Sequence, residues 1–482
     1  MKKIIYLLLG IVSTVGIVSC GLEDNIDSKS ASEVPVETLF TNAEIAFVDQ
    51  YNNMNVNYNI SRMLAQYWSD VTYTDGSRYD FQDRGIPDTF WAEFYRDVLM
   101  DLEEAKALIE AEDYSASAYL QNQAKNQVAI IEVLEVYTYS VLTETFGDVP
   151  YTEANLGADN FTPKYDDAAT IYADLFTRLD AAIADLDASN ASFGDIELLF
   201  DGDITEWKTF ANSLKLRMAM RMADVPSFGS EAKVLEAVAA GVYDANLDGA
   251  FFEYIGSDPY VNTIYDGFTI DGRNDYCPSN TLIDMMNDLN DPRLPLLFTT
   301  EGGEYVGIQF GLVDGVPYAN YSHFADSFFE PTLEAILSDY SEMEFFLAEA
   351  VERGWAVGGT AEDHYNNGIT ASILYYGGTQ ADADAYLAQP SVAYATAVGN
   401  WKQKIGTQKW LAMYNRGIEG WSEWRRLDQP ILNYPVGMTY DDIPTRFPYP
   451  YSESSMNPSY FDAVSDMGGD DSATVKLWWD KN

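Results

Sequence analysis

Residues 67–81 combine aromatic rings with planar polar side chains in a stretch that the sequence predicts to be a loop. Flat ring faces pack against the apolar side of a pyranose, while carboxylate, amide and guanidinium groups hydrogen-bond to its hydroxyls. The residues that could do this chemistry are Trp68, Tyr73, Asp75, Arg78 and Tyr79. The segment therefore predicts a carbohydrate-binding loop. The alternative is a loop that packs its rings against the next helix.

Two later segments carry the same mixture of rings and polar groups, residues 260–276 and residues 317–324. The candidates for ligand contact are Tyr265, Phe268, Arg273, Asn274 and Tyr276 in the first, and Tyr318 and Tyr321 in the second. Long irregular loops in a compact protein usually serve a function, so ligand contact is one interpretation of both segments. Structural packing is the alternative for both segments.

The side chains that usually build a catalytic or metal site form no clear constellation. His323 and His364 are far apart in sequence, and Cys277 is expected to be a buried apolar residue. The chain has 76 acidic residues, so many carboxylate pairs could form, and a surface glycosidase stays an alternative without a preferred pair. Residues 244–249 begin like a calcium loop, but its twelfth position is Ile255 and not a bidentate glutamate. We therefore expect a non-catalytic protein without cofactor or metal.

The first twenty residues predict export and lipid attachment. Lys2 and Lys3 precede an apolar stretch, residues 4–18, that is too short for a comfortable membrane span. The run Ile-Val-Ser-Cys that ends at Cys20 looks like a bacterial lipobox, in which the chain is cut before the cysteine and the cysteine is acylated. Residues 1–19 are thus predicted to be a signal peptide. Several acyl chains would tether the protein to a membrane. The alternative is a plain secretory signal with an incidental cysteine.

The composition indicates a folded and strongly acidic protein. With 76 acidic and 28 basic side chains the net charge is −48, which repels phosphate backbones and argues against nucleic acid as a partner. The content of 47% hydrophobic and 14% aromatic residues argues against disorder. A polar tether, residues 20–34, is predicted to lead into one folded domain, residues 35–482. Only two cysteines are present, so packing and not disulfide bonds must hold that domain.

Residues 35–245 of this domain predict a helical scaffold. Apolar residues recur at steps of three and four in 120–145, 166–187 and 205–223, which is typical of helices with one buried face. Helices of this length joined by short turns indicate helical hairpins of the tetratricopeptide kind. The fold class expected is therefore mainly α.

The remainder of the domain changes character twice. Residues 246–331 are rich in glycine, proline, aspartate, asparagine and scattered aromatics, and predict a loop-rich insertion with a few short strands. Residues 332–482 return to helical patterns, with helices expected at 332–353 and 391–427 among others. A proline- and aromatic-rich tail, residues 430–482, is expected to drape over the core.

Six phrases that span nearly all of the chain after Cys20 follow the order of one known family. They are F-G-D-V-P-Y-T-E at 146–153, W-K-T-F-A-N-S-L-K-L-R-M-A-M-R at 207–221, D-P-R-L at 291–294, Y-S-E-M-E-F-F-L-A-E-A at 340–350, Q-K-W at 408–410 with E-W-R-R at 423–426, and G-G-D-D at 468–471 with L-W-W-D at 477–480. Together they resemble the SusD/RagB family, the surface lipoproteins of Bacteroidetes nutrient-uptake systems, and its SusD-like outer-membrane branch in particular.

The resemblance implies a mostly helical fold on tetratricopeptide-like helix pairs. It implies a lipid-anchored place on the outer membrane, and a SusC-like TonB-dependent transporter that the lipoprotein caps like a hinged lid. It implies the capture of an oligosaccharide at the cell surface for that transporter. RagB-like members are similar in sequence yet serve peptide import, so a peptide-capturing lid is the alternative. The six phrases are expected to mark scaffold, with Glu423 paired to Arg425 or Arg426 in a buried turn or, alternatively, in a surface salt bridge that contributes little.

Overall fold

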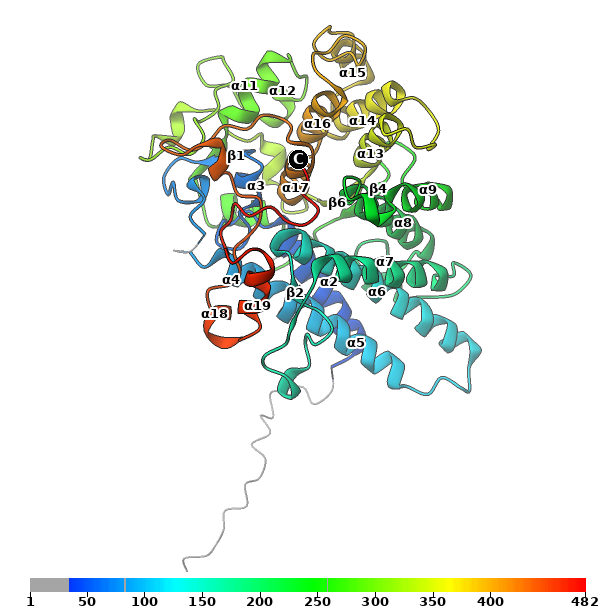
Figure 1. Cartoon of the computed structure of the whole chain (residues 1–482). Coiled ribbons are helices and arrows are strands. Elements are labelled where there is room, and N and C mark those ends of the chain that lie inside the picture. Colours follow the sequence, from blue (N-terminus) through cyan, green and yellow to red (C-terminus); the bar gives the residue numbers. More distant parts are fainter. Residues whose placement is uncertain (1–33, 82–83, 258) are drawn as a thin grey trace, which may run out of the picture.

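The protein is described here by a computed structural model of residues 34–81, 84–257 and 259–482, in which helices predominate (Figure 1). The predicted signal peptide, Cys20 and nearly all of the predicted tether lie outside these residues. None of the helices in the described ranges combines the length and the apolar content that a bilayer crossing requires. The mainly helical fold predicted from the sequence is confirmed.

The long helices α6, α7 and α8 of the N-terminal half start at side chains that accept hydrogen bonds from their free N–H groups. The Asp167 carboxylate accepts the Thr170 N–H at 2.8 Å before one of them, and the Asp203 carboxylate accepts the Thr205 N–H at 2.7 Å before the next. A π-helical stretch, Glu93–Leu99, joins α4 to α5. The helices are α2 (Val36–Asn52), α3 (Ser61–Leu64), α4 (Ile86–Ala92), α5 (Met100–Ala111), α6 (Ala118–Phe146), α7 (Ala168–Asp185), α8 (Ile204–Arg221) and α9 (Ser230–Ala240).

The C-terminal half alternates loops with shorter helices. Its helices are α10 (Thr263–Tyr265), α11 (Asn280–Asp288), α12 (Leu294–Leu297), α13 (Tyr340–Glu352), α14 (Ala361–Tyr375), α15 (Gln380–Leu387), α16 (Trp401–Ala412), α17 (Gly417–Leu427), α18 (Glu453–Met456) and α19 (Tyr460–Asp466). Consecutive helices pack as pairs, α6 with α7, α8 with α9 and α13 with α14 (Figure 1). The expected helical hairpins are therefore present.

Three small antiparallel pairs of strands join segments of the chain, two of them far apart in sequence. The strands are β1 (Trp68–Asp70), β2 (Val149–Pro150), β3 (Tyr165–Asp166), β4 (Gly249–Phe252), β5 (Tyr276–Pro278) and β6 (Ala335–Asp339), paired as β1–β5, β2–β3 and β4–β6. The β1–β5 pair connects the N-terminal half to the predicted loop-rich insertion. The residues that resemble the start of a calcium loop lead directly into β4.

Two helices predicted from the sequence have the wrong extent. Residues 332–353 do not form one helix, because residues 335–339 pair with β4 as strand β6 and α13 starts only at Tyr340. Residues 391–427 likewise do not form one helix, because residues 391–400 form turns and the rest is divided between α16 and α17. The break falls at Asn415, whose φ of 67° lies in the left-handed region, where a right-handed helix cannot continue.

Five helices meet at a buried set of charged side chains, which we call the ion-pair core. It consists of Glu144 on α6, Arg217 and Arg221 on α8, Glu342 and Glu349 on α13, Lys409 on α16, Arg416 just before α17, and Glu419, Glu423 and Arg426 on α17. Arg221 contacts Glu144 at 2.8 Å, Glu419 at 2.8 Å and also Glu423. Such a set keeps the packing of the helices in register, because each buried charge needs its partner.

Glu423 makes one of the two contacts expected from the sequence. Its carboxylate lies 2.6 Å from the Arg426 guanidinium, and both side chains are buried. Burial alone would raise the pKa of Glu423, but Arg426, Lys409 and Arg221 together hold it well below its ordinary value. Arg425 instead lies over the Trp421 ring, with its guanidinium carbon 3.6 Å from the ring centroid.

Candidate functional site

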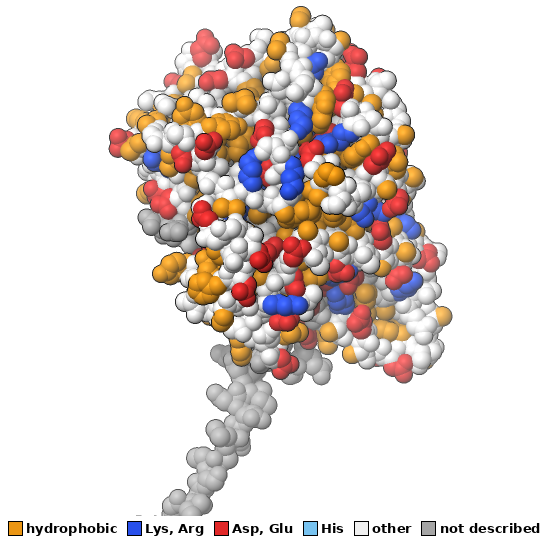
Figure 2. Space-filling view, in the orientation of Figure 1, with side chains coloured by type: hydrophobic (Ala, Val, Ile, Leu, Met, Phe, Trp, Pro, Cys, Tyr) orange, Lys and Arg blue, Asp and Glu red, His pale blue; other side chains and the backbone are white. Residues whose placement is uncertain are grey.

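The three aromatic segments predicted from the sequence converge on one part of the structure. Strand β1 pairs with β5, which places Ser69 opposite Cys277. The Val316 N–H donates to the Val71 carbonyl at 2.7 Å and brings the third segment to the end of β1. We call the result the loop face, defined as residues 71–78, 265–275 and 312–323. Hydrophobic side chains gather on the surface over β1, α11 and α12 (Figure 2).

A small apolar cluster supports the loop face from below. Val71, Cys277 and Ile308 are buried together, and the partly buried Tyr318 and Tyr321 rings pack against them. Burial raises the pKa of the Cys277 thiol to about 12, so the group stays protonated at neutral pH. A buried thiol without a neighbouring base is not a nucleophile, which agrees with the structural role expected for Cys277.

Several predicted rings reach the surface of the loop face. The Tyr73 side chain is 60% exposed. Tyr318 and His323 stack with ring centroids 3.9 Å apart and planes 8° apart, and both remain partly exposed. Tyr321 and Tyr265 are also partly exposed. Exposed flat rings beside polar loops are the surface that the apolar face of a sugar requires.

The second predicted segment adds polar groups around a buried ring. The Arg273 guanidinium lies 5.4 Å from the centroid of the Tyr276 ring and 2.7 Å from the Asp275 carboxylate, which fixes its direction. Asn274 is exposed between them in sequence, and its amide can both donate and accept. Phe268 is partly buried and packs edge-on against Trp68 at 5.9 Å.

The structure places three of the predicted contact residues in the core. Trp68 and Tyr276 are each 1% exposed, and Tyr79 is 9% exposed. Trp68 packs against Phe324 at 4.7 Å, and the Tyr79 hydroxyl accepts a hydrogen bond from Gln66 at 2.9 Å. The β1–β5 pairing turns Trp68 and Tyr276 inward, and Tyr79, just after the 3-10 turn, packs against Phe310 at 5.8 Å. Direct ligand contact by these three is therefore not supported.

The first predicted segment divides at a short 3-10 turn, Gly76–Arg78. Asp75, just before that turn, and Arg78, its last residue, line a hollow of about 580 Å³ next to residues 471–473 of the C-terminal tail. Arg78 donates to the Val436 carbonyl at 2.9 Å and to the Gly311 carbonyl at 3.2 Å. Its guanidinium thus holds two loops together, and the exposed Asp75 carboxylate forms an ion pair with Arg84 at 3.2 Å.

Asp70 is a functional candidate that the sequence reasoning did not single out. Its buried carboxylate accepts the Ser77 N–H at 2.6 Å and braces the turn that carries Tyr73. A Cβ on Gly76 would lie 2.9 Å from this carboxylate, so glycine is needed for the close approach. Burial raises the pKa of Asp70 to about 7, against the smaller effect of its bond to Ser77. Asp70 lies six residues before this glycine, so no local sequence pattern identifies it.

Within the described residues, no group of three or more His, Cys, Asp or Glu side chains is arranged to hold a metal ion. The loop face offers rings, an amide and a guanidinium, which are groups that can contact a sugar. The family profile described as "Starch-binding associating with outer membrane" matches residues 28–450.

The chain belongs to this SusD-like family. A chitin-binding protein of known structure is 30% identical, with a TM-score of 0.79 over 93% of this chain and 100% of that one. A chitin-binding SusD homolog from Flavobacterium johnsoniae is 26% identical, with a TM-score of 0.77 over 93% of this chain and 99% of that one. A SusD homolog from Bacteroides uniformis, at 23% identity and a TM-score of 0.77, shares the SusD-like fold over 93% of this chain and 99% of its own. No curated protein matches the chain.

Proposed function

We propose that this SusD-like protein captures oligosaccharides at the cell surface without cleaving them, and delivers them to a SusC-like TonB-dependent transporter in the outer membrane. The loop face is the capture surface. Tyr73 and the stacked pair of Tyr318 and His323 receive the sugar rings, while Arg273 and Asn274 bond to hydroxyl groups.

The observation that carries the proposal is the convergence of three aromatic segments, distant in sequence, on one face. Single exposed rings are ordinary, but rings that gather on one face mark a surface that can bind a ligand. The likeness to two chitin-binding structures at 30% and 26% identity supports a glycan as the ligand and makes chito-oligosaccharides the first probes. Cys277 is buried and its thiol stays protonated, so it is not an activated nucleophile, and the described residues of the loop face supply no other. This supports binding without turnover.

Titration calorimetry of the mature protein tests the proposal. The panel contains chito-oligosaccharides, other β- and α-linked glucans, and unrelated tetra- to octapeptides, each incubated afterwards to look for cleavage. We expect binding of at least one glycan series and no new reducing ends. Binding of peptides with no glycan bound would favour a peptide-capturing lid, and release of reducing ends that one carboxylate variant abolishes would establish a glycosidase.

The proposed anchor is tested separately at Cys20, which lies outside the described residues. With Cys20→Ala we expect the protein to leave the membrane fraction or to accumulate with its signal peptide uncut, because no cysteine remains to be acylated. Cell fractionation with immunoblotting is the measurement, and Cys277→Ala is the matched control that should stay in the membrane fraction. Unchanged membrane partition of Cys20→Ala would contradict lipid attachment at this residue.

The proposed transporter is tested by mild detergent extraction of the native membrane. We expect a large outer-membrane β-barrel protein to co-purify with the wild-type lipoprotein. Its absence from the purified material, with the lipoprotein itself intact, would contradict the delivery step while leaving glycan capture untouched.

A further inference from the structure

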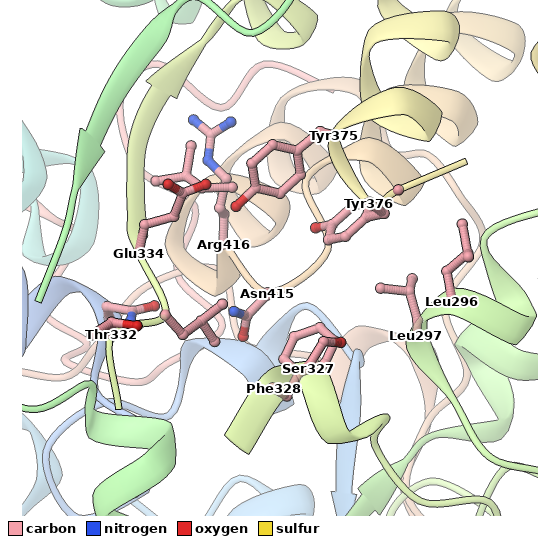
Figure 3. A pocket seen from close by; sticks show the side chains of 14 residues that line it. Leu296, Leu297, Ser327, Phe328, Thr332, Glu334, Tyr375, Tyr376, Asn415 and Arg416 are labelled. Atoms are coloured by element: carbon pink, nitrogen blue, oxygen red, sulfur yellow. The ribbon is translucent and has the colours of Figure 1, made fainter. Parts of the chain in front are cut away.

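A second cavity, of about 400 Å³, opens away from the residues assigned to the loop face. Its wall comes from α12, from residues 327–336 including the start of β6, from the end of α14, and from the link between α16 and α17 (Figure 3). None of the candidate residues predicted from the sequence lines it. Its chemistry therefore needs an explanation of its own.

One end of this cavity is acidic. The Tyr375 hydroxyl is hydrogen-bonded to the Glu334 carboxylate, and the two groups point toward one another (Figure 3). In the described ranges, no lysine or arginine forms an ion pair with Glu334 or with the nearby Glu253. Burial, followed by the charge of Glu253, raises the pKa of Glu334. An unpaired, partly buried carboxylate beside aromatic rings favours a small cationic donor such as an ammonium group.

Donors without acceptors lie on the same wall. The Arg416 guanidinium is 4% exposed and uses its terminal nitrogens on Asp339 and Glu342, while its Nε has no acceptor among the described residues. The Asn415 Oδ1 accepts from Arg62 at 2.8 Å, so its amide nitrogen remains to donate. A buried donor left unpaired is costly. The Arg416 Nε is buried away from the cavity, so an acceptor carried by a ligand, such as a carboxylate, would satisfy the Asn415 amide.

The other end of the cavity is apolar. Leu296, Leu297 and Phe328 form it, and the Tyr376 ring lies between the two ends (Figure 3). The Tyr376 hydroxyl donates to the Tyr414 carbonyl at 2.8 Å, which holds that ring in place. Binding at the apolar end would be stabilised by about 25 cal/mol for each Å² of apolar ligand surface removed from water.

We propose that this cavity binds a free α-amino acid with an apolar or aromatic side chain. The ammonium group lies against Glu334 and the Tyr375 hydroxyl. The carboxylate accepts from the Asn415 amide beside Arg416. The side chain fills the end formed by Leu296, Leu297 and Phe328. A zwitterion with an apolar substituent matches all three parts of the wall at once, and the site is independent of glycan capture.

Calorimetry with L-phenylalanine and L-leucine tests the site, with phenethylamine, 3-phenylpropionate and N-acetylglucosamine as probes that each lack one matching part. We expect measurable binding of both amino acids, at least tenfold weaker binding of phenethylamine and 3-phenylpropionate, and no binding of N-acetylglucosamine. Amino acid binding should be unaffected by saturating chito-oligosaccharide. Absence of amino acid binding, or equal binding of 3-phenylpropionate, would overturn the proposal.

Glu334→Gln is the matching variant, and Glu301→Gln, an exposed acid outside the cavity, is its control with the same change in net charge. We expect Glu334→Gln to weaken L-phenylalanine at least tenfold and to leave 3-phenylpropionate unchanged, with wild-type behaviour for the control. A thermal melt checks folding, and Leu296→Ala serves as the second variant, expected to weaken L-phenylalanine more than glycine. Wild-type affinity in both folded cavity variants would overturn the site.

Discussion

In the ion-pair core the buried Arg221 contacts three carboxylates, whereas on the loop face the Tyr73 ring is 60% exposed and has no comparable partner. The core joins five helices, and a change to any one of its charges leaves others unpaired. The loop face rests on a three-residue strand pair and one small apolar cluster. The difference indicates that the ion-pair core maintains the fold, whereas side chains of the loop face can be changed without loss of the fold.

The largest effect is expected from breaking the ion-pair core. Arg221→Met leaves the carboxylates of Glu144, Glu419 and Glu423 without a shared cation in a buried site, so the free energy of unfolding should fall by about 3–5 kcal/mol. Urea unfolding followed by circular dichroism measures this. The matched control is Arg96→Met, which removes an exposed arginine from its pairs with Glu93 and Asp97 and should cost less than about 1 kcal/mol. Equal losses in the two variants would remove the distinction between core and surface charges.

The sequence identified the scaffold more completely than the loop face, and the physical reason is the range of the interactions. Helices such as α6, α7 and α8 depend on local periodicity, so their apolar stripes predict them. Strand β6 forms by pairing with β4, which lies more than eighty residues away in sequence. Its apolar run, taken locally, therefore predicts part of a helix. Another predicted helix is interrupted at Asn415, whose positive φ is not indicated by the sequence pattern.

The same limit applies to the candidate site. Composition identified the segments that converge on the loop face, because loops rich in rings cannot bury them all. It could not decide which rings turn inward, since Trp68 and Tyr276 are buried by a strand pairing that joins segments more than two hundred residues apart. Asp70 was not identified as a brace for the same reason. Its role depends on burial, which the sequence does not show directly.

A second effect, which sharpens the comparison, is expected at Asp70, whose buried carboxylate accepts the Ser77 N–H in the loop face turn. Its pKa is about 7 in the folded protein and near 3.8 in the unfolded chain, so the folded state binds the proton more readily. The stability contributed by the protonated form is full below about pH 4 and is lost as the pH rises to about 7. Asp70→Asn removes this titration and keeps an acceptor for Ser77. The wild type should lose up to about 4 kcal/mol relative to the variant between these pH values.

Urea unfolding of both proteins at several pH values between 4 and 8 measures this difference. The control is Asp75→Asn, an exposed acid in the same segment, whose stability should follow the wild type at every pH. A constant difference between Asp70→Asn and the wild type across this range would show that Asp70 does not titrate there.

The most direct test of glycan capture by the loop face compares two tyrosines of equal exposure. Tyr73 on the loop face is 60% exposed, and Tyr119 at the start of α6 on the scaffold is 61% exposed. With the tightest glycan from the panel, calorimetry should show that Tyr73→Ala weakens binding by about 1–3 kcal/mol with an unchanged thermal melt, while Tyr119→Ala binds like the wild type. Wild-type affinity in Tyr73→Ala, or equal weakening in both variants, would contradict the assignment of the loop face as the capture surface.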